Sequence, residues 1–444
     1  MPSAGYPKGD LSSESPMTRA LRNLAPKQLR TADVIPSEDK LHTSLRLEYA
    51  AMGATSPGPT LQIPTFWLRD SCPCPACRDP DSGQKNFSST RVPESPKVSS
   101  AEVGGDGSLT VAWENDTLSG GKEHMSTWPA GETSRWTAGE SPSNIHPLPL
   151  PGQYKWSRAM IEAVLPHCRI SYEDWVAGGA PFWRALFALH QTGLIFVSGV
   201  PESEKSVEDI AAKVGSIQET FYGRTWDVVS KPRAENVAYT SQFLGLHQDL
   251  LYWPDTPKLQ FLHCLANSCD GGESIFSDGV KAAEEVRDRD PSAFDSLTRE
   301  VTPFHYNKDG HFYFRKLAVV PVADNSNPTR INWSPPFQGM PVIPAADEAG
   351  WGAADLLRWK AAAGMLEEAA SASENLYEYK LRPGECVVFD NHRILHGRNE
   401  FNTSQGRRWL KGCYVAQVDY DLKLNHLVGE LTADPASFEA ATMS

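Results

Sequence analysis

The chain has 444 residues, of which 40% are hydrophobic and 22% charged, and a formal net charge of −13. This length and composition are typical of a soluble globular protein with two or three domains. The acidic balance opposes binding to nucleic acid, which requires clustered Lys and Arg, and would favour a cationic ligand. The longest apolar stretches, such as Gly193–Val200, are too short to cross a bilayer, so no membrane span is expected.

Cysteine content and the first residues bear on the compartment. Eight cysteines in a long chain without an apolar leader predict reduced thiols, as in the cytosol, rather than four disulfides. We expect residues 1–44 to be a disordered tail. Its basic residues among many Ser and Thr resemble a transit peptide, but Asp10 and Glu14 interrupt that pattern. The sequence therefore predicts a cytoplasmic protein, with mitochondrial import as the alternative.

A small β domain is predicted at residues 45–128. Short runs with strand composition occur at Leu45–Tyr49, Thr65–Arg69 and Leu109–Trp113, separated by links rich in Gly, Pro and Ser. The polar stretch 129–152 has the composition of a linker. It separates this domain from a second one, at residues 153–444.

The second domain is predicted to be mainly β with flanking helices. Helical periodicity occurs at Pro181–Gln191, Val207–Val214, Gly279–Val301 and Ala353–Ser371. Strand composition occurs at Gly193–Val200, Val237–Tyr239, Leu259–Ala266, Ser274–Ser277, His311–Val322, Cys386–Phe389 and Trp409–Val418. Many short strands without regular alternation of strand and helix indicate a β-sandwich or jelly roll with helices packed outside.

A candidate metal site lies in the segment GLHQDLLY. Its His247 and Asp249 stand two positions apart at an expected strand end, so both side chains can reach one ion. The segment FDNHRILHGR supplies a third ligand, His396, just after the strand Cys386–Phe389. Two imidazoles and one carboxylate on one face of an octahedron are typical of non-haem iron(II) sites, because the opposite positions stay open for a cosubstrate and dioxygen.

A cosubstrate with two carboxylates needs a cation at its far end. Arg408, twelve positions after His396, is the first candidate for a bidentate clamp, with Arg407 as the fallback. Neighbours in a strand point to opposite faces, so only one of the two arginines should face inward. Ser274 is a candidate hydroxyl donor to the same carboxylate.

Each of these residues also has a purely structural interpretation. A His-x-Asp pair often occurs by chance, and four other histidines are interpreted as packing or solvent residues: His263, His305, His311 and His392. The whole ordered set of His-x-Asp, Ser, His and Arg is far less expected by accident. We therefore interpret it as an iron site with its cosubstrate clamp.

A cysteine cluster lies in the first domain. Cys72, Cys74 and Cys77 occur in CPCPAC, and His124 follows in KEHMSTW. Three thiolates and one imidazole would form a closed tetrahedral zinc site that stabilises a domain with little core. The alternative is three buried free thiols, since cysteine is among the most buried residue types.

Aromatic residues accompany the metal motif. Tyr222 and Trp226 are four positions apart, Tyr239 precedes the His-x-Asp pair, and Tyr414 follows Arg408. Rings that converge near an iron would suit a quaternary ammonium through cation–π attraction. From the residues alone, ordinary core packing explains them equally well.

The motifs together resemble those of a known family. Their order and spacing are similar to the taurine dioxygenase superfamily, and more closely to the γ-butyrobetaine and trimethyllysine hydroxylases of carnitine synthesis. The most specific pieces are FWLRDSCPCPACRDP, FYGRTW, NVAYTSQFLGLHQDL, LHCL, FDNHRILHGR and RRWLKGCY. The resemblance covers nearly everything after Leu45.

This resemblance implies a fold, an activity and several residue roles. The fold is a double-stranded β-helix (jelly roll) core, and the activity is hydroxylation coupled to oxidative decarboxylation of 2-oxoglutarate. The matching cysteines and histidine bind structural zinc in those hydroxylases. In γ-butyrobetaine hydroxylase the residues matching Tyr222, Trp226, Tyr239 and Tyr414 form the trimethylammonium cage, and Asn236 matches a residue that contacts the substrate carboxylate.

Two departures concern the acid end of the substrate. Leu250 stands where the animal butyrobetaine enzyme has Tyr, and Ser334 stands where a second carboxylate-binding Asn is expected. The residues that match the ammonium-binding part of the site are thus retained, whereas these two residues of its acid-binding part are not.

Three hypotheses follow for the function. The first is conversion of γ-butyrobetaine to carnitine. The second is a trimethyllysine hydroxylase, or a related dioxygenase that acts on another small acid in a specialised pathway. The third is a catalytically silent zinc-binding interaction protein. The expected cofactors are Fe(II), 2-oxoglutarate and Zn(II), with ascorbate as a candidate reductant. The expected partners are dioxygen and a small cationic substrate, with a homodimer as a further option.

Overall fold

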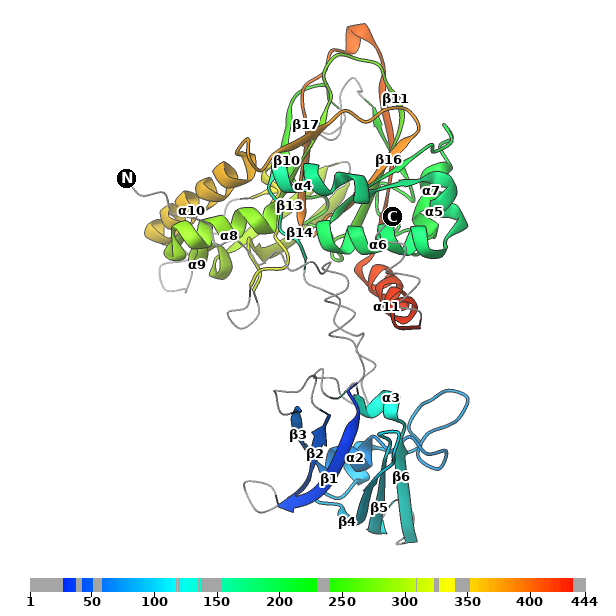
Figure 1. Cartoon of the computed structure of the whole chain (residues 1–444). Helices are drawn as coiled ribbons and strands as arrows, with labels where there is room; N and C mark the ends of the chain where they lie inside the picture. Colours follow the sequence, from blue (N-terminus) through cyan, green and yellow to red (C-terminus); the bar gives the residue numbers. More distant parts are fainter. Residues whose placement is uncertain are drawn as a thin grey trace, which may run out of the picture. The chain divides into compact units, whose positions relative to one another are not determined.

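A computed structural model describes residues 27–36, 42–50, 58–116, 118, 120, 122–134, 136, 153–229, 240–308, 310–322, 327–339 and 352–433. The chain divides into two compact units, Met1–Leu150 and Pro151–Ser444, which are labelled by element in Figure 1. We treat the N-terminal and the C-terminal unit separately.

The N-terminal unit contains two three-stranded antiparallel sheets. Their orders are β1-β2-β3 and β4-β5-β6. The strands are β1 (Leu29–Pro36), β2 (Thr43–Tyr49), β3 (Thr60–Pro64), β4 (Lys97–Val103), β5 (Leu109–Asp116) and β6 (Lys122–Trp128). Short helical segments are α2 (Thr65–Asp70), η1 (Ser89–Arg91) and α3 (Ala130–Thr133). Both sheets bury leucines and tryptophans in one core, among them Leu47, Trp113 and Trp128.

Three expectations for this unit need correction. Strand β1 lies inside the predicted disordered tail, and its Leu29 is buried in the core. Thr65–Arg69 is helix α2 rather than a strand, because a short apolar run fits either element and the burial of Leu68 and Arg69 decides. The predicted linker began too early, since α3 and the buried Trp136 belong to the unit.

Two mainly antiparallel sheets form the centre of the C-terminal unit. The larger has the order β7-β8-β16-β11-β18-β9 and the smaller β10-β17-β12-β15, and β7–β8 is the parallel pair. The strands are β7 (Arg169–Ser171), β8 (Leu194–Ser198), β9 (Trp226–Val229), β10 (Leu244–His247), β11 (Leu259–Asn267), β12 (Ser274–Asp278), β15 (Tyr377–Tyr379), β16 (Glu385–Asp390), β17 (Ile394–Arg398) and β18 (Arg408–Val415). Neighbours far apart in sequence, such as β11 and β18, are the non-local antiparallel pairings that a jelly roll requires.

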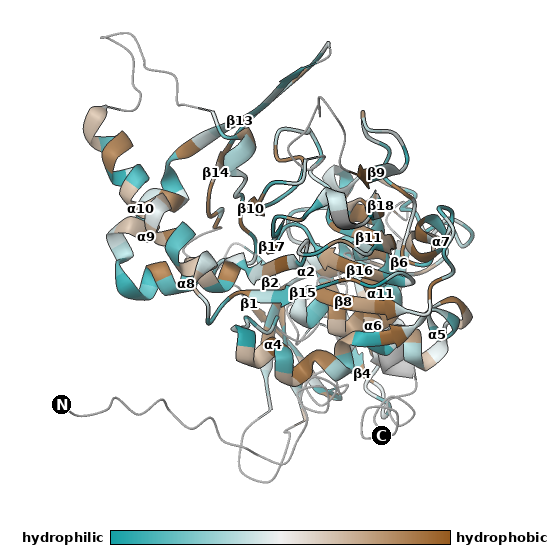
Figure 2. Ribbon diagram, turned by 90° about the horizontal axis from the view of Figure 1, so that it is seen from above, coloured by the Kyte–Doolittle hydropathy of each residue, from teal (hydrophilic) through white to brown (hydrophobic). Residues whose placement is uncertain are grey.

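Helices cover these sheets from two sides. The elements are α4 (Arg158–Val164), η4 (Leu165–Cys168), α5 (Tyr172–Ala177), α6 (Gly179–Thr192), α7 (Ser206–Ala212), α8 (Gly279–Arg289), α9 (Pro291–Arg299), α10 (Ala353–Ser371) and α11 (Gln417–Ala433). Figure 1 shows α8, α9 and α10 grouped together, and α5, α6 and α7 grouped beside the larger sheet. In Figure 2, β8 and parts of α6 have the colour of hydrophobic residues. No helix in the described part of the chain is long and apolar enough to cross a membrane.

The long helix predicted at Gly279–Val301 is two helices. Asp290 ends α8 and accepts hydrogen bonds from the amides of Ser292 and Ala293, so it caps α9, and Pro291 occupies the first helical position. The following β13 (Val301–Lys308) pairs with β14 (His311–Ala318) as a hairpin, of which the sequence analysis recovered only the second strand. Helix α11 was not predicted at all, and the expected strand Val237–Tyr239 lies outside the described residues.

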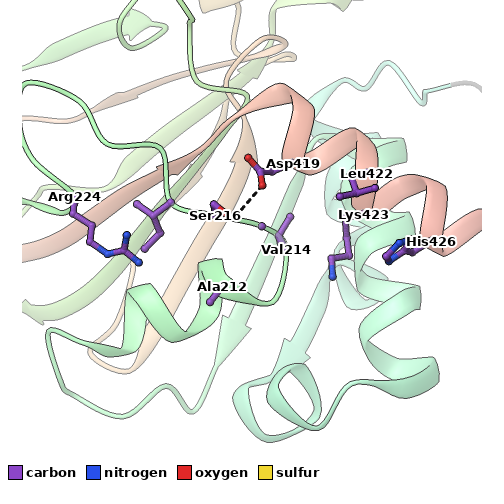
Figure 3. Close-up of a pocket in the computed structure, with 10 residues that line it drawn as sticks. Ala212, Val214, Ser216, Arg224, Asp419, Leu422, Lys423 and His426 are labelled. Atoms are coloured by element: carbon purple, nitrogen blue, oxygen red, sulfur yellow. Dashed lines mark hydrogen bonds between the residues drawn. The ribbon is translucent and has the colours of Figure 1, made fainter. Parts of the chain in front are cut away.

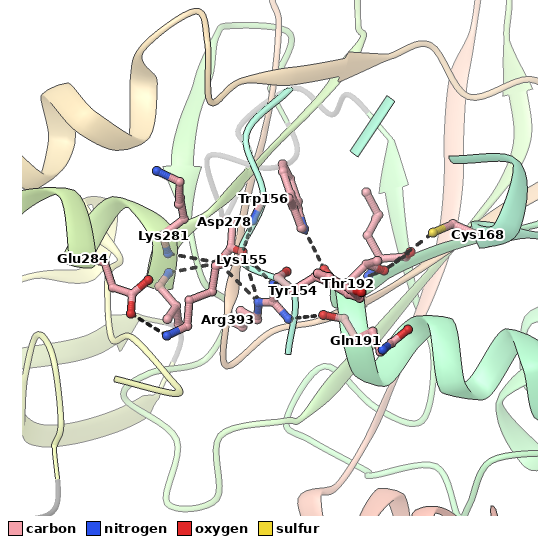
Figure 4. Close-up of polar contacts among 12 residues, drawn as sticks. Tyr154, Lys155, Trp156, Cys168, Gln191, Thr192, Asp278, Lys281, Glu284 and Arg393 are labelled. Carbon is pink, nitrogen blue, oxygen red and sulfur yellow. Dashed lines mark hydrogen bonds and ion pairs between the residues drawn. The ribbon is translucent and has the colours of Figure 1, made fainter. Parts of the chain in front are cut away.

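A buried ion pair fixes the start of the strand that carries His396. Arg393 and Asp278 are both fully buried, with 2.7 Å between Nη2 and Oδ2 (Figure 4). Arg393 also donates to the carbonyls of Gln191 and Tyr154, and Asp278 accepts from the Trp156 amide. Asp278 further caps α8, so these two side chains join four segments of the C-terminal unit.

Candidate active site

The two candidate imidazoles lie opposite each other on neighbouring strands. His247 is the last residue of β10, and His396 is its direct partner on β17, with 4.4 Å between ring centroids. His396 therefore lies within a strand of its own and not merely after β16. Asp249 follows β10, and its Oδ1 lies 3.4 Å from Nε2 of His247 and 3.9 Å from Nε2 of His396. One ligand atom from each residue lies within 4.8 Å of the others.

The surroundings of Asp249 stabilise its negative charge. Burial would raise the pKa of this carboxyl group, but the neighbouring imidazoles of His247 and His396 and the hydrogen bond from Tyr414 outweigh that effect and hold the pKa below its usual range. The Tyr414 hydroxyl donates to Oδ2 at 2.7 Å, which leaves Oδ1 directed at the imidazoles. Burial, followed by the neighbouring His247, lowers the pKa of His396 to about 3, so this ring is neutral at physiological pH.

These residues fit an iron(II) ion. Nδ1 of His247 lies 2.8 Å from the Gly245 carbonyl, so the proton belongs on Nδ1 and the Nε2 lone pair is free for a metal. A neutral imidazole and an ionised carboxylate are the protonation states that ligate a divalent cation. Two imidazoles and one carboxylate form the facial set that leaves other coordination positions available.

A cavity beside the metal ligands is lined by both polar and apolar side chains. It is lined by Trp226, Val228, Leu244, His247, Asp249, Gln260, Leu262, Ser274, His396, Gly397, Arg398, Arg408 and Leu410. Ser274 and Arg408, both predicted for the cosubstrate, thus share the cavity with the three candidate ligands. Ser274 lies on β12 directly opposite Arg398 on β17.

Two buried arginines lie in this cavity, although the sequence analysis singled out one. Arg408 is 5% exposed and Arg398 3% exposed, and both guanidinium groups lie near the Phe401 ring. Burial lowers the pKa of Arg408 to about 10, and burial together with Arg408 lowers that of Arg398 to about 9. An anion bound between them would relieve this cost. Alternation along β17 puts Arg398 on the same face as His396, which is the signal that could have identified it.

The fallback candidate, Arg407, points away from the cavity. It is exposed, and its guanidinium carbon lies 4.3 Å from the centroid of the Trp409 ring. The expected alternation of the two neighbouring arginines is therefore present.

Three of the four predicted cage residues lie in the described part of the chain. The rings of Trp226 and Tyr414 stack with centroids 4.0 Å apart, and Tyr414 contacts Asp249 as described above. Gly412 opposes Trp226 across β18 and β9, and a Cβ there would lie 2.5 Å from the indole, so only glycine permits this ring position. The Tyr222 hydroxyl lies 3.4 Å from that of Tyr252. Tyr239 and Asn236 lie outside the described residues.

A larger aromatic cluster, which the sequence analysis did not recognise, adjoins the site. It consists of Phe221, Tyr222, Tyr252, Trp253, Tyr306, His311, Tyr313 and Phe337. Tyr252 and Tyr306 stack at 5.3 Å, and Tyr306 pairs with Tyr313 across the β13–β14 hairpin. Burial, Tyr222 and the nearby Asp249 charge raise the pKa of Tyr252. The hairpin pairing brings these rings together, and no local sequence pattern announces it.

The two departures at the acid end have clear structural positions. Leu250 is buried and adopts a φ of +60°, the left-handed conformation that few non-glycine residues adopt. Ser334 is fully buried, and its hydroxyl donates to the Gln248 carbonyl at 2.8 Å. This hydroxyl is therefore engaged with the protein backbone.

The other histidines lie outside the metal site. His263 and His392 are buried, whereas His305 and His311 are exposed on the β13–β14 hairpin, where His311 joins the aromatic cluster. None of the four belongs to a group of metal-ligating side chains found among the described residues.

The predicted cysteine cluster is assembled in the N-terminal unit. Nε2 of His124 lies 3.3, 3.7 and 3.5 Å from the sulfurs of Cys72, Cys74 and Cys77. Tetrahedral zinc with ordinary bond lengths separates a sulfur and a nitrogen ligand by about 3.6 Å. The four side chains therefore fit a zinc ion. In addition, Arg69 donates to the Cys77 sulfur at 3.3 Å and pairs with Asp116.

A second cavity, of about 470 Å³, lies beside α7 and α11 (Figure 3). Arg224, Asp419, Lys423 and His426 are among its lining residues, and Asp419 accepts a hydrogen bond from the Ser216 amide. Arg224 is paired with Glu208. None of the candidate metal ligands lines this cavity.

Comparison with known proteins agrees with the two units. Residues 149–414 match the family described as taurine catabolism dioxygenase TauD, TfdA family, and residues 43–121 match the N-terminal domain described as γ-butyrobetaine hydroxylase-like. Dioxygenase str8 of Strobilurus tenacellus is 35% identical over 80% of this chain and 82% of its own length. γ-Butyrobetaine dioxygenase of Pseudomonas sp. strain AK-1 is 30% identical over 79% and 86%. Trimethyllysine dioxygenase of Meyerozyma guilliermondii is 25% identical over 83% and 91%.

These matches confirm the resemblance seen in the motifs, and with it the expectation of iron(II) and 2-oxoglutarate as cofactors. The chain belongs to the TauD, TfdA family of dioxygenases and carries a γ-butyrobetaine hydroxylase-like N-terminal domain.

Proposed function

We propose that this protein hydroxylates a small trimethylammonium acid, with γ-butyrobetaine, which would yield carnitine, as the first candidate. The observation that carries the proposal is the position of Trp226, which lines the metal cavity and stacks on Tyr414, whose hydroxyl binds Asp249. Aromatic faces attract a quaternary ammonium and also offer apolar contact to its methyl groups. Relatives named for γ-butyrobetaine and for trimethyllysine support the same substrate class.

In the proposed reaction, substrate, dioxygen and 2-oxoglutarate give hydroxylated substrate, succinate and carbon dioxide. His247, Asp249 and His396 would hold iron(II), which supplies the activation of dioxygen. Tyr414 keeps one carboxylate oxygen of Asp249 occupied, so the other is directed at the metal. Arg408, with Arg398 and Ser274 nearby, would bind the far carboxylate of 2-oxoglutarate and orient it in the cavity.

The two residues expected to bind the acid group of the substrate favour a second candidate substrate. The Ser334 hydroxyl is engaged with the Gln248 carbonyl, and Leu250 offers no polar group. A substrate whose acid group binds elsewhere, such as trimethyllysine or another small acid, is therefore the alternative. The relative named only as a dioxygenase fits that alternative.

We further propose that Cys72, Cys74, Cys77 and His124 bind one structural zinc ion. Their sulfur–nitrogen distances support it. A closed set of four protein ligands leaves no position for a substrate, so this metal would stabilise the N-terminal unit.

The test is turnover of a substrate panel. Succinate formation is measured with γ-butyrobetaine, 4-aminobutyrate, trimethyllysine and a neutral isostere of butyrobetaine. We expect the trimethylammonium compounds to be preferred, and Trp226→Ala to lower their kcat/KM about ten- to thirtyfold, equivalent to about 1–2 kcal/mol. Trp183→Ala, in α6 and away from the cavity, is the control. Equal turnover of the charged and the neutral isostere would exclude the aromatic cage.

A further inference from the structure

We propose that Asn391 and Gln248 are positioning residues that hold Asp249 in its metal-binding geometry. The inference rests on the proposed iron site and adds residues that touch neither metal nor substrate. Both side chains are polar and 0% exposed. Each is engaged with the short segment that carries Asp249.

Asn391 binds both backbone groups of Asp249. Its Oδ1 accepts from the Asp249 amide at 2.9 Å, and its Nδ2 donates to the Asp249 carbonyl at 3.1 Å. The same Nδ2 donates to the Pro257 carbonyl at 3.0 Å. The carboxamide thus substitutes for a strand partner just beyond the end of β10, where no described strand pairs with the chain.

Gln248 fixes the same segment from its other side. Its backbone amide donates to the Trp333 carbonyl, and its Oε1 accepts from the Trp333 amide, both at 2.8 Å. Its Nε2 donates to the Asn391 carbonyl, which links the two positioning residues. The Ser334 hydroxyl occupies the Gln248 carbonyl. Every polar group of Gln248 is therefore hydrogen-bonded.

The backbone conformation of Leu250 shows why the hydrogen bonds of Asn391 and Gln248 are needed. Leu250, the residue after Asp249, has a φ of +60°, a left-handed conformation that is strained for a non-glycine residue. The turn continues with a hydrogen bond from the Trp253 amide to the Leu250 carbonyl. Without the hydrogen bonds of Asn391, the chain could relax toward ordinary φ values, and relaxation here would move Asp249 away from the two imidazoles.

Asn391 precedes the strand that carries His396. It follows β16, and its own backbone amide donates to the Lys258 carbonyl at 2.8 Å. Because Arg393 is anchored by Asp278, this turn is held firmly on both sides of Asn391. The hydrogen bonds of Asn391 and Gln248 therefore set the position of Asp249 relative to His396, and not merely the local shape of one loop.

The test measures Fe(II) binding to the full-length, zinc-loaded protein under anaerobic conditions. Fe(II) is titrated in the presence of 2-oxoglutarate, and the visible charge-transfer band of the ternary complex reports binding at this site alone. We expect Asn391→Ala to weaken Fe(II) binding about 10- to 100-fold, the range for residues that orient metal ligands. The melting temperature of the iron-free, zinc-loaded protein is measured in parallel.

Asn375→Ala is the matched control. Asn375 is equally buried and also donates two hydrogen bonds, to Glu285 and the Ala369 carbonyl, at the end of α10. It should lower the melting temperature while leaving Fe(II) affinity unchanged. If Asn391→Ala does not fold, Asn391→Asp replaces it, because the carboxylate keeps the acceptor for the Asp249 amide but cannot donate to the Asp249 carbonyl.

The outcomes separate this inference from the proposed function. If the wild-type protein gives no charge-transfer band, the iron site itself is wrong. If the wild type gives the band and the Asn391 variant binds Fe(II) as tightly, or loses no more affinity than Asn375→Ala, the positioning role is overturned.

Discussion

Asp249 is surrounded by groups that favour its ionised form. His247 and His396 lie on one side of the carboxylate, and the Tyr414 hydroxyl binds the other oxygen. No other carboxylate among the described residues shares a metal-ligating cluster with these imidazoles. We therefore expect Asp249→Ala to abolish succinate formation even with excess Fe(II). An activity equal to wild type would show that the metal ligands are misassigned.

The two neighbouring arginines, Arg407 and Arg408, give a second prediction at the residue scale. Arg408 is buried in the metal cavity, whereas Arg407 is exposed against Trp409. Arg408→Ala should raise the KM for 2-oxoglutarate at least tenfold, because a charged carboxylate would lose its partner. Arg407→Ala is the matched control and should change this KM less than twofold. The reverse order of effects would exchange the two roles.

Arg398, on β17, also bears on cosubstrate binding, because it lines the same cavity as Arg408. Its position beside Arg408 implies that both cations contribute to the field in the cavity. The affinity for a dicarboxylate should therefore weaken with ionic strength less than expected for an exposed pair, because buried charges are poorly screened.

The two faces of strand β11 lie in different environments. Gln260 and Leu262 line the metal cavity, so alternation directs His263 to the opposite face. There it is fully buried, and neither ring nitrogen has a hydrogen-bond partner among the described residues. Burial lowers the pKa of His263 to about 4, and the pKa of buried His392 is also lowered to about 4.

This burial predicts a loss of stability in acid. An unfolded histidine binds a proton with a pKa of about 6.5, whereas His263 in the folded chain resists protonation until about pH 4. Between these values, falling pH favours the unfolded state by up to about 1.4 kcal/mol per pH unit for this group. His263→Phe should therefore flatten the decline in the free energy of unfolding between pH 6.5 and 4.

Denaturant unfolding at several pH values checks this prediction. His305→Phe, on the exposed face of β13, is the control and should leave the pH dependence unchanged. Parallel curves for wild type and His263→Phe would contradict the assignment of His263 as a buried neutral residue.

At the scale of the whole molecule, the two units carry two candidate metal sites with different ligands. The N-terminal ligands are three thiolates and an imidazole, which suit zinc, and the C-terminal ligands are two imidazoles and a carboxylate, which suit iron(II). The proposed catalytic metal and the proposed structural metal therefore belong to different parts of the chain.

The two sites should accordingly be separable by mutation. Protein prepared without chelator should contain about one zinc per chain, and Cys74→Ser should lose it and unfold the N-terminal unit at lower temperature. Cys168→Ser, at a buried cysteine of the C-terminal unit, should keep the zinc. The zinc content of the wild type, Cys74→Ser and Cys168→Ser is measured. A wild-type protein without zinc would contradict the proposed zinc site.

The sequence by itself identified the family of this protein, which the comparisons confirm. Residue type and spacing sufficed to propose His247, Asp249, Arg408 and the cysteine cluster as ligands, because a metal or a carboxylate needs particular donor atoms whatever the fold, and the structure brings these residues together. Long periodic elements such as α6 and α10 were also recovered, since amphipathic patterns are local.

Tertiary structure alone decided the elements whose stability comes from distant partners. Thr65–Asp70 became helix α2, since its Arg69 pairs with Asp116 far along the chain, and Leu29 of β1 is buried in one core with the distant Trp113 and Trp128. The position of Arg398 opposite Ser274 and the hydrogen bonds of Asn391 to Asp249 likewise depend on contacts between segments more than a hundred residues apart. The aromatic cluster joins side chains from Phe221 to Phe337. Such contacts are non-local, so no window of sequence contains both partners.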